Sequence, residues 1–198
     1  MRSIINLTMR EHGIEGSNAF SGTFMPYRGD VSTRQPIPTD KLRVIQQRCQ
    51  TTDDEPRWLV ALISDTGMRL SEAAGLARED IVLDANIPHV IIRPHPWRRL
   101  KTKGSKRILP LVGASLWAGE RAVEASQHSP YLFPRYCNDK GCKANSASAA
   151  LNKWLKRTIG DVYVMHSFRH SMRDRLRVVN CPSEMIDQIG GWSKRSVG

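Results

Sequence analysis

The chain has 198 residues, enough for one well-packed domain and an additional segment. Its 30 Lys and Arg against 19 Asp and Glu give a net charge of +11, which favours nucleic acid as the partner over a membrane surface. No apolar run approaches the ~20 residues of a membrane span, and the N-terminus lacks the features of a signal peptide, so we expect a soluble intracellular protein.

Residues 2–12 read as a helix, and a stretch punctuated by Gly, Ser and Pro follows up to Pro38. We therefore predict that residues 1–35 are the end of another domain with a linker. Residues 36–198 then form the main domain.

The main domain begins with two predicted helices. The first runs from Thr39, after Pro38, to about Cys49. The second opens at Pro56, is apolar on nearly all sides and ends at Gly67, so it should be buried. Ser71 can cap a short helix after it.

Three short strands are predicted next, at Asp80–Leu83, Val90–Arg93 and Arg107–Leu111, and their close spacing implies an antiparallel sheet. The remainder reads as helices, at about Ala114–Ser126, Asn145–Thr158, His166–Val179 and Ser183–Ile189. The expected fold class is α+β, mainly helical, with a small three-stranded antiparallel sheet.

The four cysteines are too few and too irregularly spaced for a disulfide scaffold or a zinc site, so we expect reduced thiols. Cys137 and Cys142 bracket a short turn, with His128 not far away in the sequence. An ordinary loop is favoured there over a metal site, and we expect neither a metal nor a cofactor.

Residues 65–72, Asp-Thr-Gly-Met-Arg-Leu-Ser-Glu, place Arg69 in the turn that leaves the buried helix. Glu72 can orient this guanidinium through an ion pair. The alternative is a surface arginine in an ordinary turn between helices.

Residues 100–111 read as a basic hairpin whose turn carries Lys101, Lys103, Lys106 and Arg107. A lysine there can reach a phosphodiester and give a proton to a departing oxygen. The alternative is a solvated hairpin that contacts the DNA backbone for affinity alone.

Two further segments lie near the C-terminus. The helix from His166 carries Arg169, His170, Arg173 and Arg177 on a cationic side, although an ordinary amphipathic helix explains the same pattern. Trp192 follows two glycines; its indole N–H can donate to a phosphate oxygen, or the ring can simply fill the core.

In this order, the four segments resemble the signature of the tyrosine recombinase (phage integrase) family: a Thr-Gly-x-Arg-x-x-Glu box, a hairpin lysine, a His-x-x-Arg box, and Gly-His or Gly-Trp. The resemblance covers about residues 36–198, and residues 131–134 are similar to a strand-like segment of the family. Residues 1 to about 25 resemble the last helix of the core-binding domain that precedes the catalytic domain in such integrases.

The resemblance implies roles for individual residues. Arg69 and Arg169 would clamp the scissile phosphate, His166 would assist the nucleophile or the phosphate, and Trp192 would replace a second histidine. Lys101 and Lys103 both fit the hairpin lysine, and Lys101 is preferred. The resemblance assigns supporting roles to Glu72 and His170, and DNA contacts to Lys106, Arg107 and Arg173.

The family's nucleophilic tyrosine lies about nine residues after the Gly-Trp position, which would be roughly three residues past Gly198. The chain's own tyrosines, Tyr27, Tyr131, Tyr136 and Tyr163, lie upstream. We therefore expect this chain to bind DNA without cleaving it.

The implied reaction of the intact protein is site-specific DNA recombination through a 3′-phosphotyrosyl intermediate. Its partners would be double-stranded DNA at attachment sites and other integrase protomers, in the nucleoid of a bacterial or phage-infected cell. The alternatives are a non-catalytic DNA-binding module or decayed integrase and, less favoured, a type IB topoisomerase.

Overall fold

The computed structural model describes residues 2–22, 34–101 and 103–192, and the chain divides into two units, Met1–Thr33 and Arg34–Gly198. The first unit contains the predicted helix, α1 (Arg2–Glu11), on which Ile4 and Leu7 are exposed. After it, the amide of Asn18 donates to Asn6 Oδ1 at 2.6 Å. The candidate site residues all belong to the second unit.

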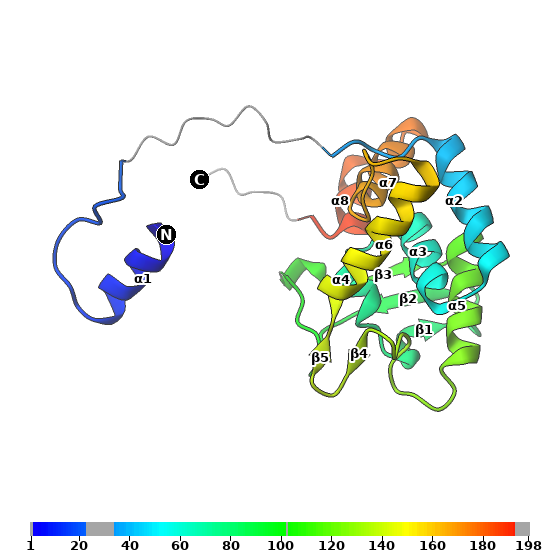
Figure 1. The fold of residues 1–198 in the computed structure, drawn as a ribbon, viewed down its shortest axis with the longest axis horizontal. Helices are drawn as coiled ribbons and strands as arrows, with labels where there is room; N and C mark the ends of the chain where they lie inside the picture. The colour runs from blue at the N-terminus through cyan, green and yellow to red at the C-terminus, as the bar shows by residue number, and fades with distance from the viewer. Residues whose placement is uncertain (1, 23–33, 102, 193–198) are drawn as a thin grey trace. The chain divides into compact units, whose positions relative to one another are not determined.

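Helix α3 (Glu55–Thr66) is the centre of the second unit (Figure 1). It begins where the Asp54 side chain accepts from the Arg57 backbone N–H at 3.1 Å, with Pro56 in the first turn. It packs against α2 (Thr39–Thr52), α5 (Gly113–Ala125) and α7 (Ser167–Val178). This enclosure explains why its sequence is apolar on nearly all sides.

The predicted antiparallel sheet is confirmed, with strand order β1 (Ile81–Val82), β2 (His89–Ile92) and β3 (Arg107–Pro110). Val90 pairs with Leu109, and both are buried. Alternation along β3 directs its first and third side chains inward. The sheet lies below α7 and α8 (Ser183–Gly190) in Figure 1.

The long connection between β2 and β3 is anchored on a buried carboxylate. Asp80 accepts from Arg93 Nε at 2.7 Å and lies 2.6 Å from His95 Nε2. The 3₁₀ turn Lys103–Ser105 follows and leads into β3. Because its first half is tied to Asp80, the connection starts from a fixed point beside the sheet.

Several local predictions differ from the structure. The short helix α4 (Leu70–Ala74) begins after Arg69, which holds the N-cap position without a side-chain capping bond, rather than after Ser71. Within residues 131–134, expected to resemble a strand-like segment, only Tyr131 makes an isolated bridge, to Ala77.

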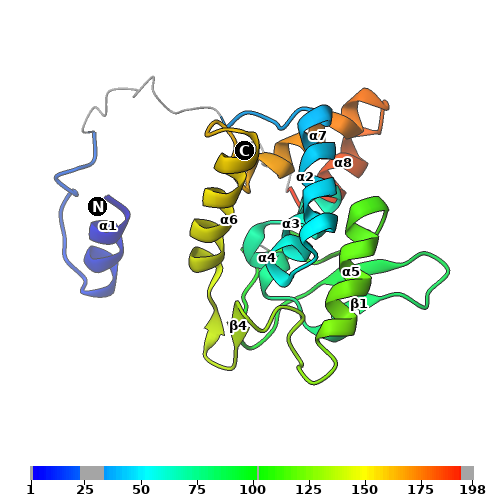
Figure 2. The same ribbon diagram turned by 45° about the vertical axis from the view of Figure 1, so that its right-hand side comes forward.

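The remaining elements connect the sheet to the C-terminal helices. Residues Cys137–Asn138 and Gly141–Cys142 form a small hairpin, β4–β5, instead of a plain loop. It leads into α6 (Ala144–Ile159), which contacts α4 and α2 (Figure 2). Among the described helices, none is long and apolar enough to cross a bilayer.

Candidate active site

Arg69 lies in the turn between α3 and α4. Gly67 ends α3 with φ +62°, a left-handed conformation that glycine adopts without strain, and the chain then turns sharply into α4. The Arg69 guanidinium is partly buried; its NH1 donates to Glu72 Oε1 at 2.5 Å and to Ser105 Oγ at 3.2 Å. The turn and these two bonds fix the guanidinium beside the β2–β3 connection.

Glu72 joins Arg69 to the sheet. Its Oε2 accepts from the Arg69 backbone N–H at 3.0 Å and from Arg107 NH2 at 2.9 Å. Burial alone would raise the pKa of this carboxyl, but the hydrogen bonds and charges of Arg107 and Arg69 outweigh it and hold the pKa below its ordinary value. Glu72 is therefore a charged, buried anchor for two guanidinium groups.

Arg169 reaches the same turn from α7. Its NH1 donates to the Gly67 carbonyl at 3.1 Å, and its NH2 donates to the Gly190 carbonyl at the end of α8. Trp192 lies over this guanidinium, 4.3 Å from the ring centroid. Burial, assisted by the charge of Arg69, lowers the pKa of Arg169 to about 10, which still leaves it protonated at neutral pH.

His166 stands at the start of α7, one turn before Arg169. Burial, followed by the charges of Arg34, His170 and Arg169, lowers the pKa of His166 to about 4. The His170 ring meets it edge to face, with centroids 5.2 Å apart. His166 is therefore a neutral imidazole in cationic surroundings at neutral pH.

The structure describes the hairpin lysines in part. Lys101 is exposed, and the 3₁₀ turn that begins at Lys103 ends at Ser105, which contacts Arg69. The side chain of Lys103 lies outside what the structure describes. The connection that carries both lysines therefore passes beside the guanidinium of Arg69.

The three residues expected to contact DNA have different surroundings. Lys106 is exposed, and Arg173 is half-buried with its guanidinium 5.2 Å from the Trp192 ring centroid. Arg107 departs from the expectation: strand alternation turns it inward, and it donates to Ile189 O, Ser105 O and Glu72. Its surroundings give it a supporting position inside the protein instead of one on an exposed surface.

Sequence reasoning missed two residues near this site, Ser105 and Arg34. Ser105 is buried just before Lys106 of the hairpin, and its Oγ accepts from Arg69, while Arg34 lies in the segment assigned to the linker. A strand register that set Arg107 inward would also have indicated Ser105. Nothing in the sequence near Arg34 points to His166.

Metal ligation has little support in the described part of the chain. Cys137 and Cys142 face each other across β4–β5, but no group of three or more His, Cys, Asp or Glu side chains there is arranged to hold an ion. Burial also raises the pKa of the Cys137 thiol to about 12, so in the metal-free protein it is a protonated thiol.

Comparison with known proteins places this geometry in context. The integrase of transposon Tn1549, in a complex with circular intermediate DNA, aligns at a TM-score of 0.60 and 16% identity over 83% of this chain and 61% of that one. XerA recombinase aligns at a TM-score of 0.65 and 16% identity over 97% of this chain and 65% of that one. XerH recombinase bound to difH substrate, in a pre-cleavage complex, aligns at a TM-score of 0.60 and 20% identity over 81% of this chain and 47% of that one.

The chain thus spans less than two thirds of each of these three structures, and at such identities the likeness concerns the fold, which is that of tyrosine recombinase catalytic domains. A search of curated proteins gave no match. The profile described as "Phage integrase family" matches residues 37–197, which include Arg69, the hairpin, α7 and Trp192. On this match, which spans most of its length, the chain belongs to the phage integrase family.

Proposed function

We propose that this chain is the catalytic part of a site-specific DNA recombinase that breaks and rejoins DNA by transesterification through a 3′-phosphotyrosyl intermediate. Its partners would be double-stranded DNA at attachment sites and further protomers of the same protein, acting on the nucleoid in the cytoplasm. The similar structures named for complexes with DNA support the partner class.

The observation that carries the proposal is the convergence of two guanidinium groups from distant segments on one turn. Arg69 lies in this turn, and Arg169, a hundred residues later, donates to the Gly67 carbonyl within it. Burying two like charges close together is unfavourable unless an anion or a carboxylate compensates them. Glu72 supplies one negative charge that Arg107 also shares, so three guanidinium groups surround one carboxylate, and a bound phosphodiester would supply a second negative charge.

The proposed reaction assigns one task to each side chain. Arg69 and Arg169 bind the non-bridging oxygens and stabilise the charge of the transition state. Neutral His166 assists, either by accepting the tyrosine proton or by bonding the phosphate. As the tyrosine oxygen bonds to phosphorus, the bond to the 5′ oxygen breaks, and Lys101 or Lys103 protonates that oxygen. A 5′-hydroxyl of the partner duplex then attacks the same phosphorus: its oxygen bonds to phosphorus, the bond to the tyrosine oxygen breaks, and the tyrosine takes back a proton.

The nucleophile in this proposal is a tyrosine that follows residue 198. The described tyrosines have other surroundings. Tyr131 is buried and donates to Asp139, and Tyr136 is also buried. The Tyr163 ring packs against Lys41, whose Nζ lies 4.9 Å from the ring centroid. Tyr27 lies outside the described residues. Chain 1–198 would accordingly hold DNA and leave it intact.

The test uses the protein continued through its natural sequence past Gly198, incubated with a nicked duplex that carries the attachment site. Cleavage near the nick releases a short strand and traps the covalent protein–DNA adduct, which is resolved on a denaturing gel. We expect an adduct with the continued protein, and none with Arg169→Ala, with a tyrosine-to-phenylalanine variant or with chain 1–198.

Arg177→Ala is the matched control, because Arg177 is exposed on the same helix and pairs only weakly with Asp174, at 3.6 Å. It should form the adduct at the wild-type level. Salt-sensitive DNA binding with no adduct from the continued protein would replace the proposal by a binding-only function. Relaxation of supercoiled DNA that lacks the attachment site would favour a topoisomerase.

A further inference from the structure

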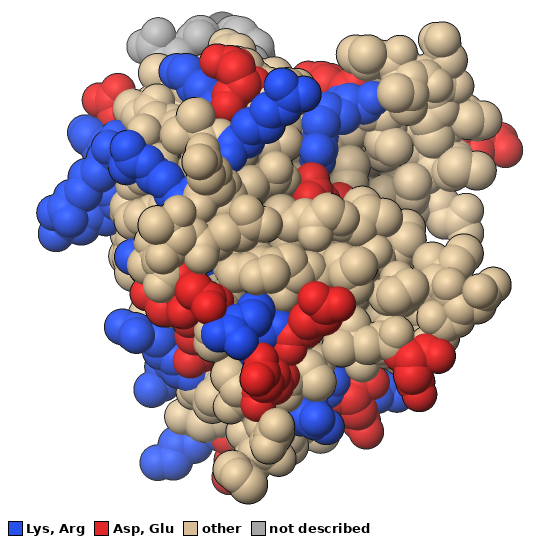
Figure 3. All heavy atoms as spheres, turned by 90° about the vertical axis from the view of Figure 1, so that its right-hand side faces the viewer, with Lys and Arg blue, Asp and Glu red and all other residues tan. Residues whose placement is uncertain are grey.

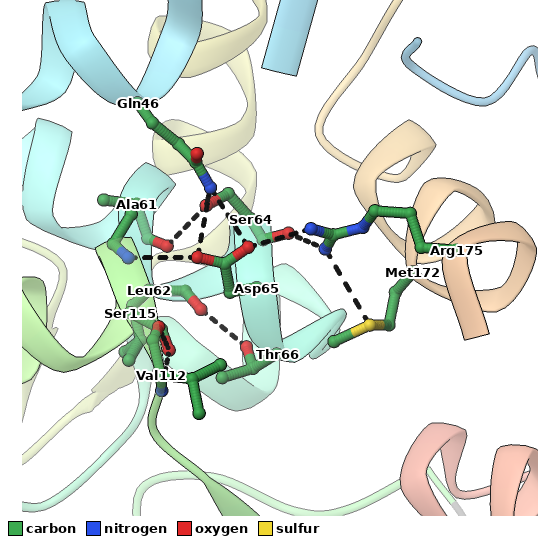
Figure 4. Close-up of polar contacts among 11 residues, drawn as sticks. Gln46, Ala61, Leu62, Ser64, Asp65, Thr66, Val112, Ser115, Met172 and Arg175 are labelled. Carbon is green, nitrogen blue, oxygen red and sulfur yellow. Dashed lines mark hydrogen bonds and ion pairs between the residues drawn. The ribbon is translucent and has the colours of Figure 1, made fainter. Parts of the chain in front are cut away.

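A largely enclosed carboxylate four residues before Arg69 joins four helices. Asp65 is next to last in α3, and its side chain is 12% exposed. It accepts from Gln46 Nε2 of α2 at 3.0 and 3.1 Å, from the Ala114 N–H in the first turn of α5 at 3.1 Å, and from Arg175 NH1 of α7 at 3.0 Å. Figure 4 shows these contacts around the end of α3.

Arg175 forms hydrogen bonds to the end of α3 at two points. Besides the ion pair with Asp65, its NH2 donates to the Ser64 carbonyl at 2.7 Å (Figure 4). A guanidinium that bonds a side chain and a backbone carbonyl through different nitrogens fixes both distance and orientation. The backbone contact also ties α7 to the helix itself, so the link does not depend on a mobile side chain alone.

The site is crowded on the side of α5 as well. Gly113, the first residue of α5, has φ +51°, and a Cβ there would come within 3.2 Å of Asp65 Oδ2. The carboxylate thus lies against the N-terminus of α5, where the free N–H groups of a helix favour a negative charge. Asp65 is held from three sides, which makes it a rigid reference point for α7.

We infer that Asp65 and Arg175 are positioning residues for the arginine pair, setting the register of α7 against the α3–α4 turn. Arg175 lies six residues after Arg169 on α7, and Asp65 lies four residues before Arg69. With the Arg169–Gly67 bond, the pair gives α7 two separate attachments to the α3 end, which oppose both sliding and rotation of α7. This inference rests on the proposed function, because it concerns the alignment of two phosphate-binding groups.

Removing the Arg175 attachment should leave the fold intact. Phe168 remains fully buried, and Met172 remains packed against Gly67. What is lost is alignment: a displacement of about 1 Å at a reacting group can reduce the rate on the order of 100-fold. DNA affinity, which depends on many backbone contacts, should change little.

The first measurement is the single-turnover rate of adduct formation at saturating DNA, with the continued protein and the nicked substrate. Arg175→Met should lower this rate at least about 10-fold, with a change in DNA dissociation constant of less than about 3-fold. Arg175→Lys, which keeps the charge and one bond, should recover part of the rate. Asp65→Asn combined with Arg175→Met should be slowed by less than the product of the two single effects, since the two residues share one of their contacts.

Arg121→Met is the matched control. Arg121 forms an ion pair of similar length, 2.8 Å, with Asp53, and it also joins two elements, α5 and the end of α2, but it has no link to the arginine turn. Its exposure, 38%, is close to the 31% of Arg175. The control should cleave within about 2-fold of wild type, as expected for a surface ion pair.

The second measurement, hydrogen exchange of chain 1–198, does not depend on DNA cleavage. Amides of residues 66–70 and 167–172 should exchange faster in Arg175→Met and at the wild-type rate in Arg121→Met. If wild type forms no adduct, the proposed function fails and exchange alone decides the positioning role. If wild type cleaves, an unchanged rate in Arg175→Met overturns the inference, as does an equal loss in Arg121→Met. Should Arg175→Met not fold, Asp65→Asn is judged by the same criteria.

Discussion

Glu72 is a buried carboxylate shared by two arginines, and this arrangement makes it the most costly single residue of the site to neutralise. Its side chain is 3% exposed and bonds Arg69 and Arg107, the latter 4% exposed. A buried charge without its partner is destabilising by several kcal/mol, because nothing replaces the water it has lost. Removing the negative charge would leave the guanidinium of Arg107 uncompensated.

We predict that Glu72→Gln lowers the free energy of unfolding by about 3 kcal/mol at neutral pH. Because the folded-state pKa of Glu72 lies below its ordinary 4.5, this contribution is present above pH 4.5 and is lost as the pH falls through the folded pKa. Urea denaturation at pH 7 and below pH 4 measures the difference. Glu124→Gln, which removes an exposed partner of Arg121, should change stability by less than about 1 kcal/mol.

His166 gives the site a second pH response, of the same sign as that of Glu72 but in a higher pH range. Its pKa is about 4 when folded and 6.5 when free, so between these values the unfolded chain binds more protons than the folded one. Stability therefore falls as the pH drops from 6.5 toward 4. The same cationic surroundings that disfavour an imidazolium would favour a bound phosphate.

We predict that wild type loses a few degrees more of Tm between pH 7 and pH 5 than His166→Gln does. Differential scanning fluorimetry at the two pH values gives the comparison, since every other titrating group is common to both proteins. NMR titration of the imidazole gives the midpoint directly. A midpoint near 6.5 in the folded protein would contradict the cationic surroundings described for His166.

At the scale of elements, the α3–α4 turn depends on Gly67 for two reasons. Its φ of +62° is strained for other residues, and a Cβ there would lie 2.9 Å from Met172 Cβ of α7. The absence of a side chain thus lets α7 approach the turn closely enough for Arg169 to bond the Gly67 carbonyl.

Gly67→Ala should lower the free energy of unfolding by about 2 kcal/mol, the sum of a left-handed alanine and a forced shift of Met172. It should also reduce adduct formation by the continued protein, because α7 moves away from Arg69. Gly104→Ala is the control: no atom lies within 4 Å of the added Cβ, and the backbone is not left-handed. Equal stability of the two variants in urea would refute the close-approach argument.

The periodicity of apolar residues predicted where helices and strands lie, but it did not predict which elements contact each other. The apolar run from Trp58 to Ile63 indicated a buried helix, and alternation indicated the strands, because both patterns arise from local geometry. The hairpin at Cys137 and Cys142 has no such pattern over its two-residue strands. Short strands are fixed by their neighbours instead of by their own sequence.

The candidate site divides in the same way. Arg69, Glu72 and Arg169 lie in segments whose order carried the prediction, whereas the inward direction of Arg107 follows from a register that the sequence left open. The contact of Asp65 with Arg175 joins residues 110 positions apart. A contact of this kind depends on the packing of α3 and α7 and cannot be read from either segment alone.

For the molecule as a whole, one side of the second unit does not carry the excess of basic side chains behind the net charge of +11. Figure 3 shows the side on which α2 and α5 lie, where acidic and basic side chains are mixed around a broad uncharged band. Mixed charges of this kind attract a phosphate backbone only weakly. The basic hairpin and the arginine turn belong to other elements, η2 (Lys103–Ser105), β3 and α4, so the DNA-facing side should be the one that they form.

This difference between faces predicts which basic side chains contact DNA phosphates and so displace counterions from the DNA. For wild-type chain 1–198, the logarithm of the binding constant should fall linearly with the logarithm of salt concentration, and Lys106→Gln should reduce the steepness of this line by about 0.9, the loss of one phosphate contact. Arg48→Gln, which removes an exposed charge from α2, should leave the steepness unchanged. Fluorescence anisotropy with one labelled duplex at several salt concentrations measures all three. Because both variants lose a single charge, an effect of net charge alone would alter the two slopes equally, and that result would place the DNA on no particular face. A smaller slope for Lys106→Gln alone would instead locate it at the hairpin, within reach of Arg69 and Arg169.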